Sequence, residues 1–414
     1  MRLISSSDTR HVSALLSQST LMSPTVERRV AKIIADVREH GDEALRRYAR
    51  TLDGWHGPLE LSLADLRRGS RGVPKEVRDA VKLAARHIRS VAKKQVPRGW
   101  RTSTAAGVTI EQRVTPLGRA GCYVPAGRYP LPSSLLMTAI PARVAGVREV
   151  IVACPRPDAT IMLAALEAGA DRVFRIGGAH AIAALAYGTA SVPRVERLVG
   201  PGNAFVAAAK AQVSRDCAID FFAGPSEIVV VSATGRADWI AADLIAQAEH
   251  DVDARAILIT PSRVLAQAVA QECGRQLPSS GPAAEALRRH GGIIVTATMD
   301  EAIALCQRAA PEHAVCDTAR AAARLTCAGT VFVGRTSAQA LGDYMTGSNH
   351  VLPTSGAARA RGGLSAADFV RVTSVQTITA KGLRRIGPAA SALARAEGLT
   401  AHAASIDMRT GAVR

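Results

Sequence analysis

Apolar residues recur at helical spacing along the first quarter of the chain. Residues 24–50 and 74–94 place apolar side chains three or four positions apart, which is the period of one helix face. The positions are Val26, Val30, Ile33, Ile34 and Val37 in the first stretch, and Val77, Val81, Ala84, Ile88 and Val91 in the second. We therefore predict two amphipathic helices whose charged residues face solvent.

From residue 106 onward, short β-branched runs alternate with alanine-rich stretches of helical length. The predicted strands are 108–114, 150–153, 172–176, 196–199, 228–231, 256–260, 293–296 and 330–333. The predicted helices are 158–168, 179–187, 203–214, 237–249, 262–276, 300–309 and 317–325. Strands and helices in alternation are typical of parallel sheets with right-handed crossovers. The sequence therefore predicts an α/β fold.

A weak internal repeat indicates two open sheets of related design. Ile151-Val-Ala-Cys-Pro and Ile257-Leu-Ile-Thr-Pro each read as a strand that a helix, a glycine-containing stretch and a second strand follow. Chance would explain the repeat equally well. The tail from residue 366 begins like a strand and continues as an amphipathic helix. It is too short for a domain, so we expect it to dock elsewhere, for example on a second subunit.

Composition narrows the class of protein. A hydrophobic fraction of 48% over 414 residues supports about two buried cores, and no apolar run approaches the ~18–20 residues of a membrane span. The first 22 residues lack the apolar core of a signal peptide. The seven cysteines show no CxxC spacing, which favours free thiols in a reducing compartment. We expect a cytoplasmic protein.

The net charge of +17 raises the question of a nucleic-acid partner. The basic residues are spread along the chain, and aromatic residues make up only 3% of it, which is few for base stacking. We therefore expect no nucleic-acid partner. A basic surface would still attract anionic ligands, dinucleotides included.

Two glycine-rich turns follow predicted strands. Gly200-Pro-Gly-Asn-Ala-Phe205 opens a helix, but Phe205 stands where a dinucleotide fingerprint has its third glycine. The turn suits a phosphate or ribose, which Asn203 would contact, or it is simply a helix start with Asn203 as its cap. Gly121-Cys-Tyr-Val-Pro-Ala-Gly127 displays Tyr123, either as a stacking face for a flat ligand or as a core residue.

Several polar residues could bind a metal or carry protons. Gln247 and His250 lie three positions apart on a predicted helix, so they share one face. Glu312 and His313 follow the helix 300–309 at an expected loop-to-helix junction, where a carboxylate beside an imidazole gives two proton carriers.

Two further pairs lie nearer the C-terminus. Asp343 and His350 belong to a glycine-punctuated loop, and Glu397 and His402 to the tail. Each pair alone is also typical of solvated residues. Taken together, the candidate ligands form a mixed nitrogen and oxygen set that suits zinc. They are Gln247, His250, Asp343 and His402.

In this order the segments resemble the histidinol dehydrogenase family from about residue 24 to 410. The strings that carry the resemblance include GRAGCYVPAGRYPLPSSLLMTAIPARVAGV, GGAHAIAALAYGT, LVGPGNAFVAAAK, DFFAGPSEIVVV, ADLIAQAEHD, APEH, LGDYMTGSNHVLPT and AEGLTAHAASIDMR. Members of the family are homodimers that bind zinc and use NAD to oxidise histidinol, through histidinaldehyde, to histidine. The resemblance implies the same activity here, with one zinc ion per subunit.

The resemblance also assigns roles. The implied zinc ligands are Gln247, His250, Asp343 and, from the partner subunit, His402. Glu312 would activate water, and His313 would transfer protons. The implied substrate-binding residues are Ser226, Gln247, His250, Glu312, His313, Asp343, His350, Glu397 and His402. The implied NAD contacts are Tyr123, His180 and Asn203.

The resemblance implies two incomplete Rossmann-like domains with small terminal segments. We expect an N-terminal segment (1–23) and a C-terminal dimerisation tail (366–414). Between them we expect one discontinuous domain (24–122 with 228–365) that holds the zinc and catalytic residues. Residues 123–227 would form a second domain that contacts NAD.

The chain departs from the family pattern at a few places. Ala126 replaces a glycine, His180 replaces a glutamine, and residues 314–317 differ directly after the catalytic pair, which would alter the substrate pocket. His180 could make dinucleotide affinity depend on pH. An alternative activity is that of a paralogous zinc- and NAD-dependent dehydrogenase on another small polar alcohol. A sulfopropanediol is one example, which Arg128 could bind. A catalytically silent zinc protein that binds nucleic acid is a third alternative.

Overall fold

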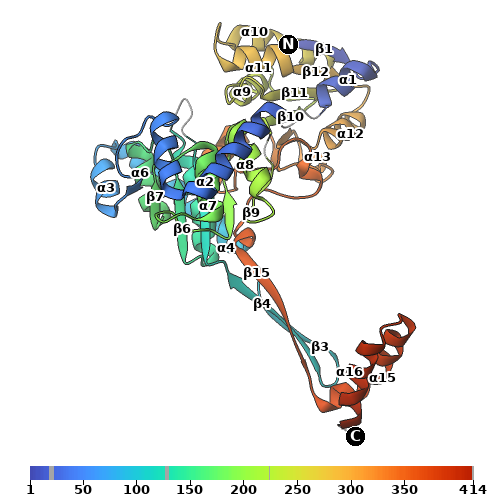
Figure 1. The fold of residues 1–414 in the computed structure, drawn as a ribbon. Coiled ribbons are helices and arrows are strands. Elements are labelled where there is room, and N and C mark those ends of the chain that lie inside the picture. Colours follow the sequence, from blue (N-terminus) through green and yellow to red (C-terminus); the bar gives the residue numbers. More distant parts are fainter. Residues whose placement is uncertain (18–22, 126–129, 223, 413–414) are drawn as a thin grey trace.

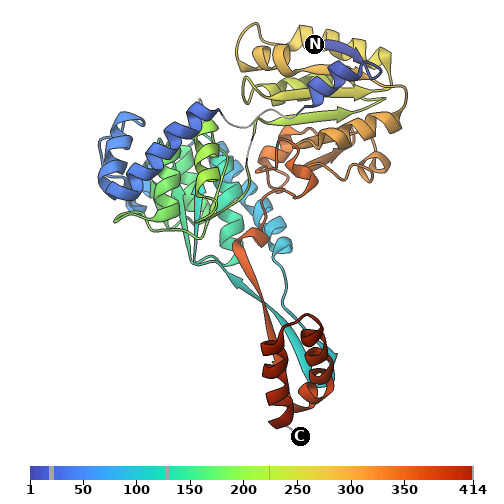
Figure 2. The same cartoon turned by 45° about the vertical axis from the view of Figure 1, so that its right-hand side comes forward.

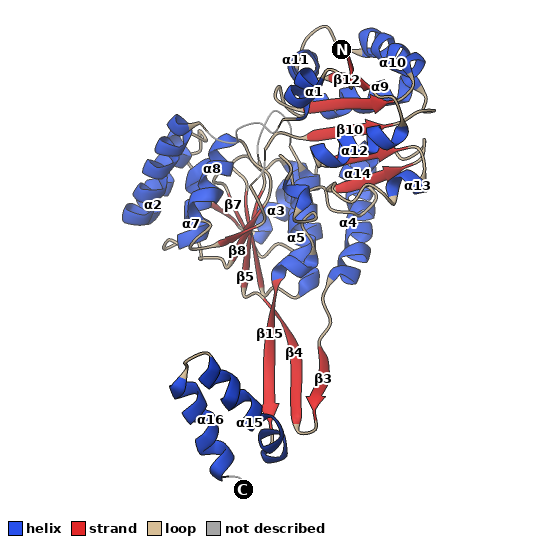
Figure 3. Cartoon of the chain, turned by 90° about the vertical axis from the view of Figure 1, so that its right-hand side faces the viewer, coloured by secondary structure: helices blue, strands red, loops and turns tan. Residues whose placement is uncertain are grey.

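The computed structural model describes residues 1–17, 23–125, 130–222 and 224–412, and the strands of these residues form three sheets (Figure 1). Two are six-stranded and largely parallel, and we name them sheet A and sheet B. The third is antiparallel and belongs to a separate arm. Figure 3 shows helices on the faces of the two large sheets. The predicted α/β fold with two open sheets is confirmed.

Sheet A has the strand order β1–β12–β11–β10–β13–β14, and every neighbouring pair is parallel. The side chains of β10 alternate between two cores, with Ile228 and Val230 on one face and Val229 and Val231 on the other. A strand buried on both faces reads as a continuous apolar run. The strands are β1 (Arg2–Ser5), β10 (Glu227–Val231), β11 (Arg255–Thr260), β12 (Gly292–Val295), β13 (His313–Cys316) and β14 (Thr330–Val333).

Helices cover both faces of sheet A. The first core includes side chains from α9 (Ala237–Ala248), α10 (Arg263–Gln276) and α11 (Pro282–His290). The second includes side chains from α1 (Thr9–Leu16), α12 (Met299–Ala309) and α13 (Ala319–Ala322). The short helix α14 (Ala340–Tyr344) follows β14.

Sheet B has the strand order β2–β7–β6–β5–β8–β9, in which only β2 is antiparallel to its neighbour. The order of its parallel strands reverses between β5 and β8. The strands are β2 (Glu60–Leu61), β5 (Arg119–Tyr123), β6 (Glu149–Ala153), β7 (Arg172–Phe174), β8 (Arg197–Val199) and β9 (Ala218–Ile219).

Sheet B is also covered on both faces. One core includes side chains from α3 (Leu63–Gly69), α4 (Lys75–Gln95), α5 (Pro132–Ala145) and α6 (Ala159–Ala168). The other includes side chains from α2 (Pro24–Thr51), α7 (Gly178–Tyr187) and α8 (Ala204–Val213). The two helices predicted in the first quarter of the chain are therefore α2 and α4.

The sheets divide the chain differently from the expected boundaries. Residues 24–95 pack with sheet B rather than with the 228–365 part, because α2 contacts α7 and α8, and α4 contacts α5. Strand β5 lies within sheet B, whereas residues 100–116 belong to the antiparallel arm. The N-terminal segment joins sheet A, where β1 pairs with β12. Both sheets offer apolar faces of the same kind, so the apolar stripes of α2 and α4 could not show which sheet they cover.

An arm projects from the body and carries the C-terminus at its end (Figures 1 and 2). Strand β15 (Val370–Ile378) pairs along its whole length with β4 (Val108–Pro116), which also pairs with β3 (Trp100–Ala105). Helices α15 (Ala380–Ala396) and α16 (Thr400–Ala412) complete the arm. The 3-10 turns η1 (Ala357–Arg359) and η2 (Ala366–Phe369) precede it. No helix among the described residues is long and apolar enough to cross a membrane.

Candidate active site

A cavity of about 1000 Å³ lies between the amino ends of the sheet A strands and the carboxyl ends of the sheet B strands. Sheet A lines it with residues at or just before the starts of its strands, and sheet B lines it with residues that follow β5, β8 and β9. In sheet B this is the edge at which the strand order reverses. Open parallel sheets typically bind ligands at such a place.

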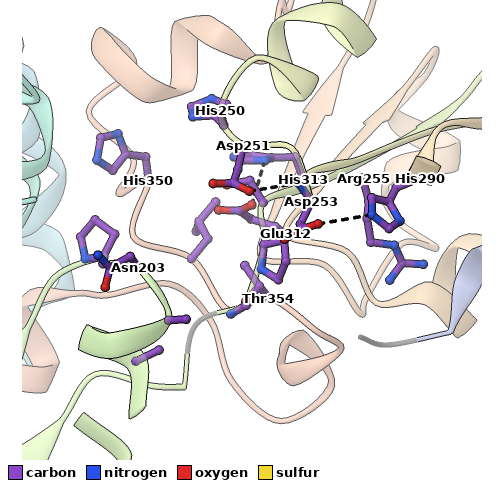
Figure 4. A pocket seen from close by; sticks show the side chains of 18 of the residues that line it. Asn203, His250, Asp251, Asp253, Arg255, His290, Glu312, His313, His350 and Thr354 are labelled. Carbon is purple, nitrogen blue, oxygen red and sulfur yellow. Dashed lines mark hydrogen bonds and ion pairs between the residues drawn. The ribbon is translucent and has the colours of Figure 1, made fainter. Parts of the chain in front are cut away.

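Glu312 and His313 line the cavity at the start of β13 (Figure 4). The junction is therefore loop-to-strand, not the expected loop-to-helix, because His313 pairs with Ile228 of β10. Glu312 Oε2 accepts a hydrogen bond of 2.9 Å from the backbone N–H of Glu227. His313 Nδ1 donates one of 3.2 Å to the carbonyl oxygen of Glu227. One backbone unit thus orients both side chains.

Burial shifts the pKa values of this pair in opposite directions. It raises the pKa of the Glu312 carboxyl well above its ordinary value, although the hydrogen bond from Glu227 favours the charged form. It lowers the pKa of His313 to about 4. His313 is therefore neutral at pH 7, and its Nε2 accepts a proton because Nδ1–H is donated to Glu227. Opposed pKa values in neighbouring groups are typical of acid–base catalysis.

A buried amide that no sequence motif marks connects His313 with Asp343. The side chain of Gln339 is almost fully buried, and its Nε2 donates a hydrogen bond of 2.9 Å to Asp343 Oδ2. The same nitrogen lies 3.5 Å from His313 Nε2. Only the position of Gln339 one turn before Asp343 could have pointed to it, since residues four apart on a helix share a face.

The predicted substrate-binding residues of the body divide into those that line the cavity and Gln247. Ser226 lies beside Glu312 and favours its charged form through a side-chain hydrogen bond. His350 Nδ1 donates a hydrogen bond of 3.0 Å to the carbonyl oxygen of Asp343, and burial lowers the pKa of His350. The lining residues among the predicted set are Ser226, His250, Glu312, His313, Asp343 and His350.

Gln247 has the environment expected of a metal ligand. It is fully buried on α9, and neither its side-chain oxygen nor its nitrogen has a hydrogen-bond partner among the described residues. Such an orphaned amide costs free energy unless a ligand satisfies it. Helix α9 ends at Ala248, so His250 follows the helix instead of continuing it, and its Nε2 lies 4.0 Å from Asp343 Oδ2. An amide, an imidazole and a carboxylate together fit zinc.

The fourth expected ligand lies elsewhere. Glu397 follows the last residue of α15, and His402 belongs to α16, so both are exposed in the arm and away from the cavity of their own chain. In the part of the chain that the structure describes, no group of three or more His, Cys, Asp or Glu side chains is arranged to hold a metal ion. The expected zinc ligands could not form such a group within one chain. Outside the arm, only His250 and Asp343 among them are His, Cys, Asp or Glu residues.

The glycine-rich turn after β8 forms the sheet B wall of the cavity. Asn203 lines the cavity and also caps α8, since its Oδ1 accepts hydrogen bonds from the backbone N–H groups of Phe205 and Val206. Asn203 is therefore a helix cap, and its place in the cavity wall is also compatible with a contact to a phosphate or ribose. Gly200 has φ +121°, and a Cβ there would lie 2.1 Å from the carbonyl oxygen of Tyr123. The close packing of this turn against β5 therefore requires glycine.

Tyr123 and His180, the other two expected NAD contacts, do not line this cavity. Tyr123 is only 3% exposed, and its hydroxyl oxygen accepts a hydrogen bond from the backbone N–H of Gly178, so it is a core residue here. His180 is 1% exposed; its Nε2 lies 3.0 Å from Asp53 Oδ2, and its ring stacks on Tyr48. Their contacts with NAD stay predictions, as does the pH dependence expected from His180.

The residues directly after the catalytic pair, which also depart from the family pattern, lie away from the cavity. Ala314, Val315 and Cys316 are buried side chains of β13 that pack into the two cores of sheet A and do not line the cavity. The expected alteration of the substrate pocket at these three positions is therefore wrong, because a strand buried on both faces turns its side chains into the cores. Ala126 and Arg128 lie outside the described residues.

Comparison with known proteins shows the family of the chain. The sequence pattern of the histidinol dehydrogenase family matches residues 16–410. The chain is 44% identical to histidinol dehydrogenase of Pseudomonas aeruginosa over 97% of its length and 94% of the relative. It is also 44% identical to the enzyme of Geobacillus kaustophilus, over 94% and 96% of the two chains.

A solved structure extends the likeness to three dimensions. The crystal structure of histidinol dehydrogenase from Elizabethkingia anophelis matches with a TM-score of 0.94 and 30% sequence identity, over 100% of this chain and 98% of the other. The match includes the arm, because the whole chain is covered. The chain belongs to the histidinol dehydrogenase family.

Proposed function

We propose that this protein is a histidinol dehydrogenase that oxidises L-histidinol, through histidinaldehyde, to L-histidine with NAD. The observation that carries the proposal is that Glu312, His313 and Asn203 line one cavity between two sheets. The cavity thus has proton-carrying groups on one wall and a turn suited to a dinucleotide on the other.

Gln247, His250 and Asp343 would hold one zinc ion per subunit together with His402 of the partner subunit. When bound, zinc would polarise the alcohol and aldehyde oxygens, and NAD would accept the hydride in each step. Support for the metal comes from the orphaned amide of Gln247 and from the 4.0 Å between His250 Nε2 and Asp343 Oδ2.

The protein's own groups would move the protons. His313 Nε2 takes the alcohol proton in the first step, since Nδ1 is committed to the Glu227 carbonyl. In the second step the Glu312 carboxylate takes a proton from the water that hydrates the aldehyde. Its raised pKa makes it a stronger base once it is ionised. Ser226 and His350, on the cavity wall, would hold the substrate.

The substrate site would be completed by a second subunit of a cytoplasmic homodimer. Glu397 and His402 lie on an arm that projects from the body, and the arm exposes the apolar side chains of Val372, Leu393 and Met408. An exposed apolar arm is typical of a surface that another chain covers. A site closed by two chains would also retain the reactive aldehyde.

The purified protein should reduce NAD with histidinol and, in a separate assay, with histidinaldehyde. Dihydroxypropanesulfonate tests the alternative of a paralogous dehydrogenase. We expect turnover with histidinol and its aldehyde and none with the sulfonate. Turnover with the sulfonate alone would overturn the proposal.

A further inference from the structure

A buried ion pair belongs to the sheet B wall of the cavity, which Asp220 itself lines. The side chains of Lys210, on α8, and Asp220, after β9, are 3% and 0% exposed, and their charged groups are in contact. Lys210 Nζ donates a hydrogen bond of 2.9 Å to the carbonyl oxygen of Gly200. Asp220 Oδ2 accepts one of 2.8 Å from the backbone N–H of Gly200. The two charges thus hold one glycine residue through both of its backbone groups.

The same pair also fixes a second lining segment. Asp220 Oδ1 accepts a hydrogen bond of 2.7 Å from the backbone N–H of Phe221, which lines the cavity. Two cations lie near the ring of Phe221, with Lys210 Nζ at 6.0 Å and the guanidinium of Arg361 at 4.8 Å from its centroid. Both turns at the carboxyl edge of sheet B, after β8 and after β9, therefore depend on this pair.

Stability alone is a weak reason to keep such a pair. Removing two charges from water is costly, and well-packed apolar residues often replace a buried ion pair without loss of stability. Apolar side chains could not hold both the N–H and the C=O of Gly200, however. Since Gly200 has φ +121° and packs on the Tyr123 carbonyl, its turn needs both partners to keep this shape.

We propose that Lys210 and Asp220 are positioning residues for the dinucleotide. They hold residues 200–203 so that this turn, Asn203 and Ala204 line the cavity, where the side-chain amide of Asn203 and the turn backbone would meet the phosphate and ribose oxygens of the cofactor. This inference rests on the proposed function, because it takes the ligand of this wall to be NAD.

The test compares Lys210→Met, which cannot donate a hydrogen bond, with Lys210→Arg and with Arg89→Met as a control. Arg89 forms an ion pair with Glu167 and does not line the cavity. NADH binding is titrated by fluorescence without turnover, and backbone hydrogen exchange over residues 199–206 is followed in the ligand-free protein. We expect Lys210→Met to weaken NADH binding about tenfold or more and to speed exchange at this turn. The KM for histidinol should change less than twofold, Lys210→Arg should recover part of the affinity, and Arg89→Met should match the wild type.

Unchanged NADH affinity in Lys210→Met would overturn the inference, as would equal losses for NADH and histidinol. If Lys210→Met does not fold, Asp220→Asn serves in its place, because its amide still accepts from Gly200 but loses the charge that pairs with Lys210. Wild-type affinity and exchange in that variant would also overturn the inference. A wild-type protein that binds NADH but does not oxidise histidinol would contradict the proposed function alone, and the exchange measurement would still decide about the pair.

Discussion

Replacing Gln339 with Leu removes the amide between His313 and Asp343 while keeping a side chain of similar size. The amide nitrogen is 2.9 Å from Asp343 Oδ2 and 3.5 Å from His313 Nε2, and the residue is 1% exposed. A hydrogen bond to a charged acceptor is worth about 1.5–3 kcal/mol. If the reaction needs the geometry that this bond holds, the variant must restore that geometry at this cost, and kcat/KM for histidinol falls roughly 10- to 150-fold, at ~1.36 kcal/mol per factor of ten.

The assay measures kcat/KM, zinc content and Tm for Gln339→Leu and for Gln276→Leu. The control loses comparable bonds, since Gln276 Nε2 donates to the Asp238 carbonyl and the Glu272 carboxylate at 3.0 Å, but it does not line the cavity. We expect the control to keep its kinetics. A kcat/KM within twofold of the wild type for Gln339→Leu, with full zinc content, would refute the proposed bridging role.

Four further outcomes are expected. His250→Ala should lose zinc and activity but keep its circular dichroism spectrum, and full zinc occupancy by metal analysis would contradict the ligand assignment. Truncation after residue 379 should give an inactive protein, because it removes Glu397 and His402; an active, strictly monomeric product in gel filtration would argue against a shared site. Glu312→Gln should slow oxidation of histidinaldehyde more than that of histidinol, because only the aldehyde step needs activated water; equal losses with the two substrates would count against this role. Finally, His313→Gln should make the free energy of unfolding less sensitive to pH between about 6.5 and 4. In the wild type, as the pH decreases over this range, the unfolded imidazole gains a proton and the buried one does not. The free energy of unfolding therefore decreases by up to about 3 kcal/mol because of this group. Identical slopes in urea titrations of the two proteins would contradict this.

The alternation of strands and helices could be predicted from the sequence. Runs rich in β-branched residues, such as Ile257–Ile259, are buried on both faces of a parallel sheet and therefore stand out along the chain. Strand β13 was not predicted from the sequence. That strand is four residues long and begins with His313, so it offers neither the length nor the apolar start of a strand. The expected helix junction at Glu312 followed from this.

Contacts between distant segments were not accessible from the sequence. His180 faces Asp53, and Lys210 and Asp220 meet at Gly200; neither arrangement follows from spacing along the chain. The family resemblance assigned residues to the site by their motifs. It could not reveal Gln339, whose part depends on how closely the residue before α14 approaches His313 at the start of β13.

Because β15 pairs with β4, the arm holds Glu397 and His402 away from the body of its own chain, and this arrangement would have a genetic consequence. If two arms are exchanged between subunits as proposed, a chain lacking His250 and a chain lacking His402 are each inactive alone. A mixed dimer of the two contains one site with both defects and one with neither. Two null alleles of this gene would then complement each other. An equal mixture that reassorts freely should recover about one quarter of wild-type activity, since half of the dimers are mixed and each has one intact site.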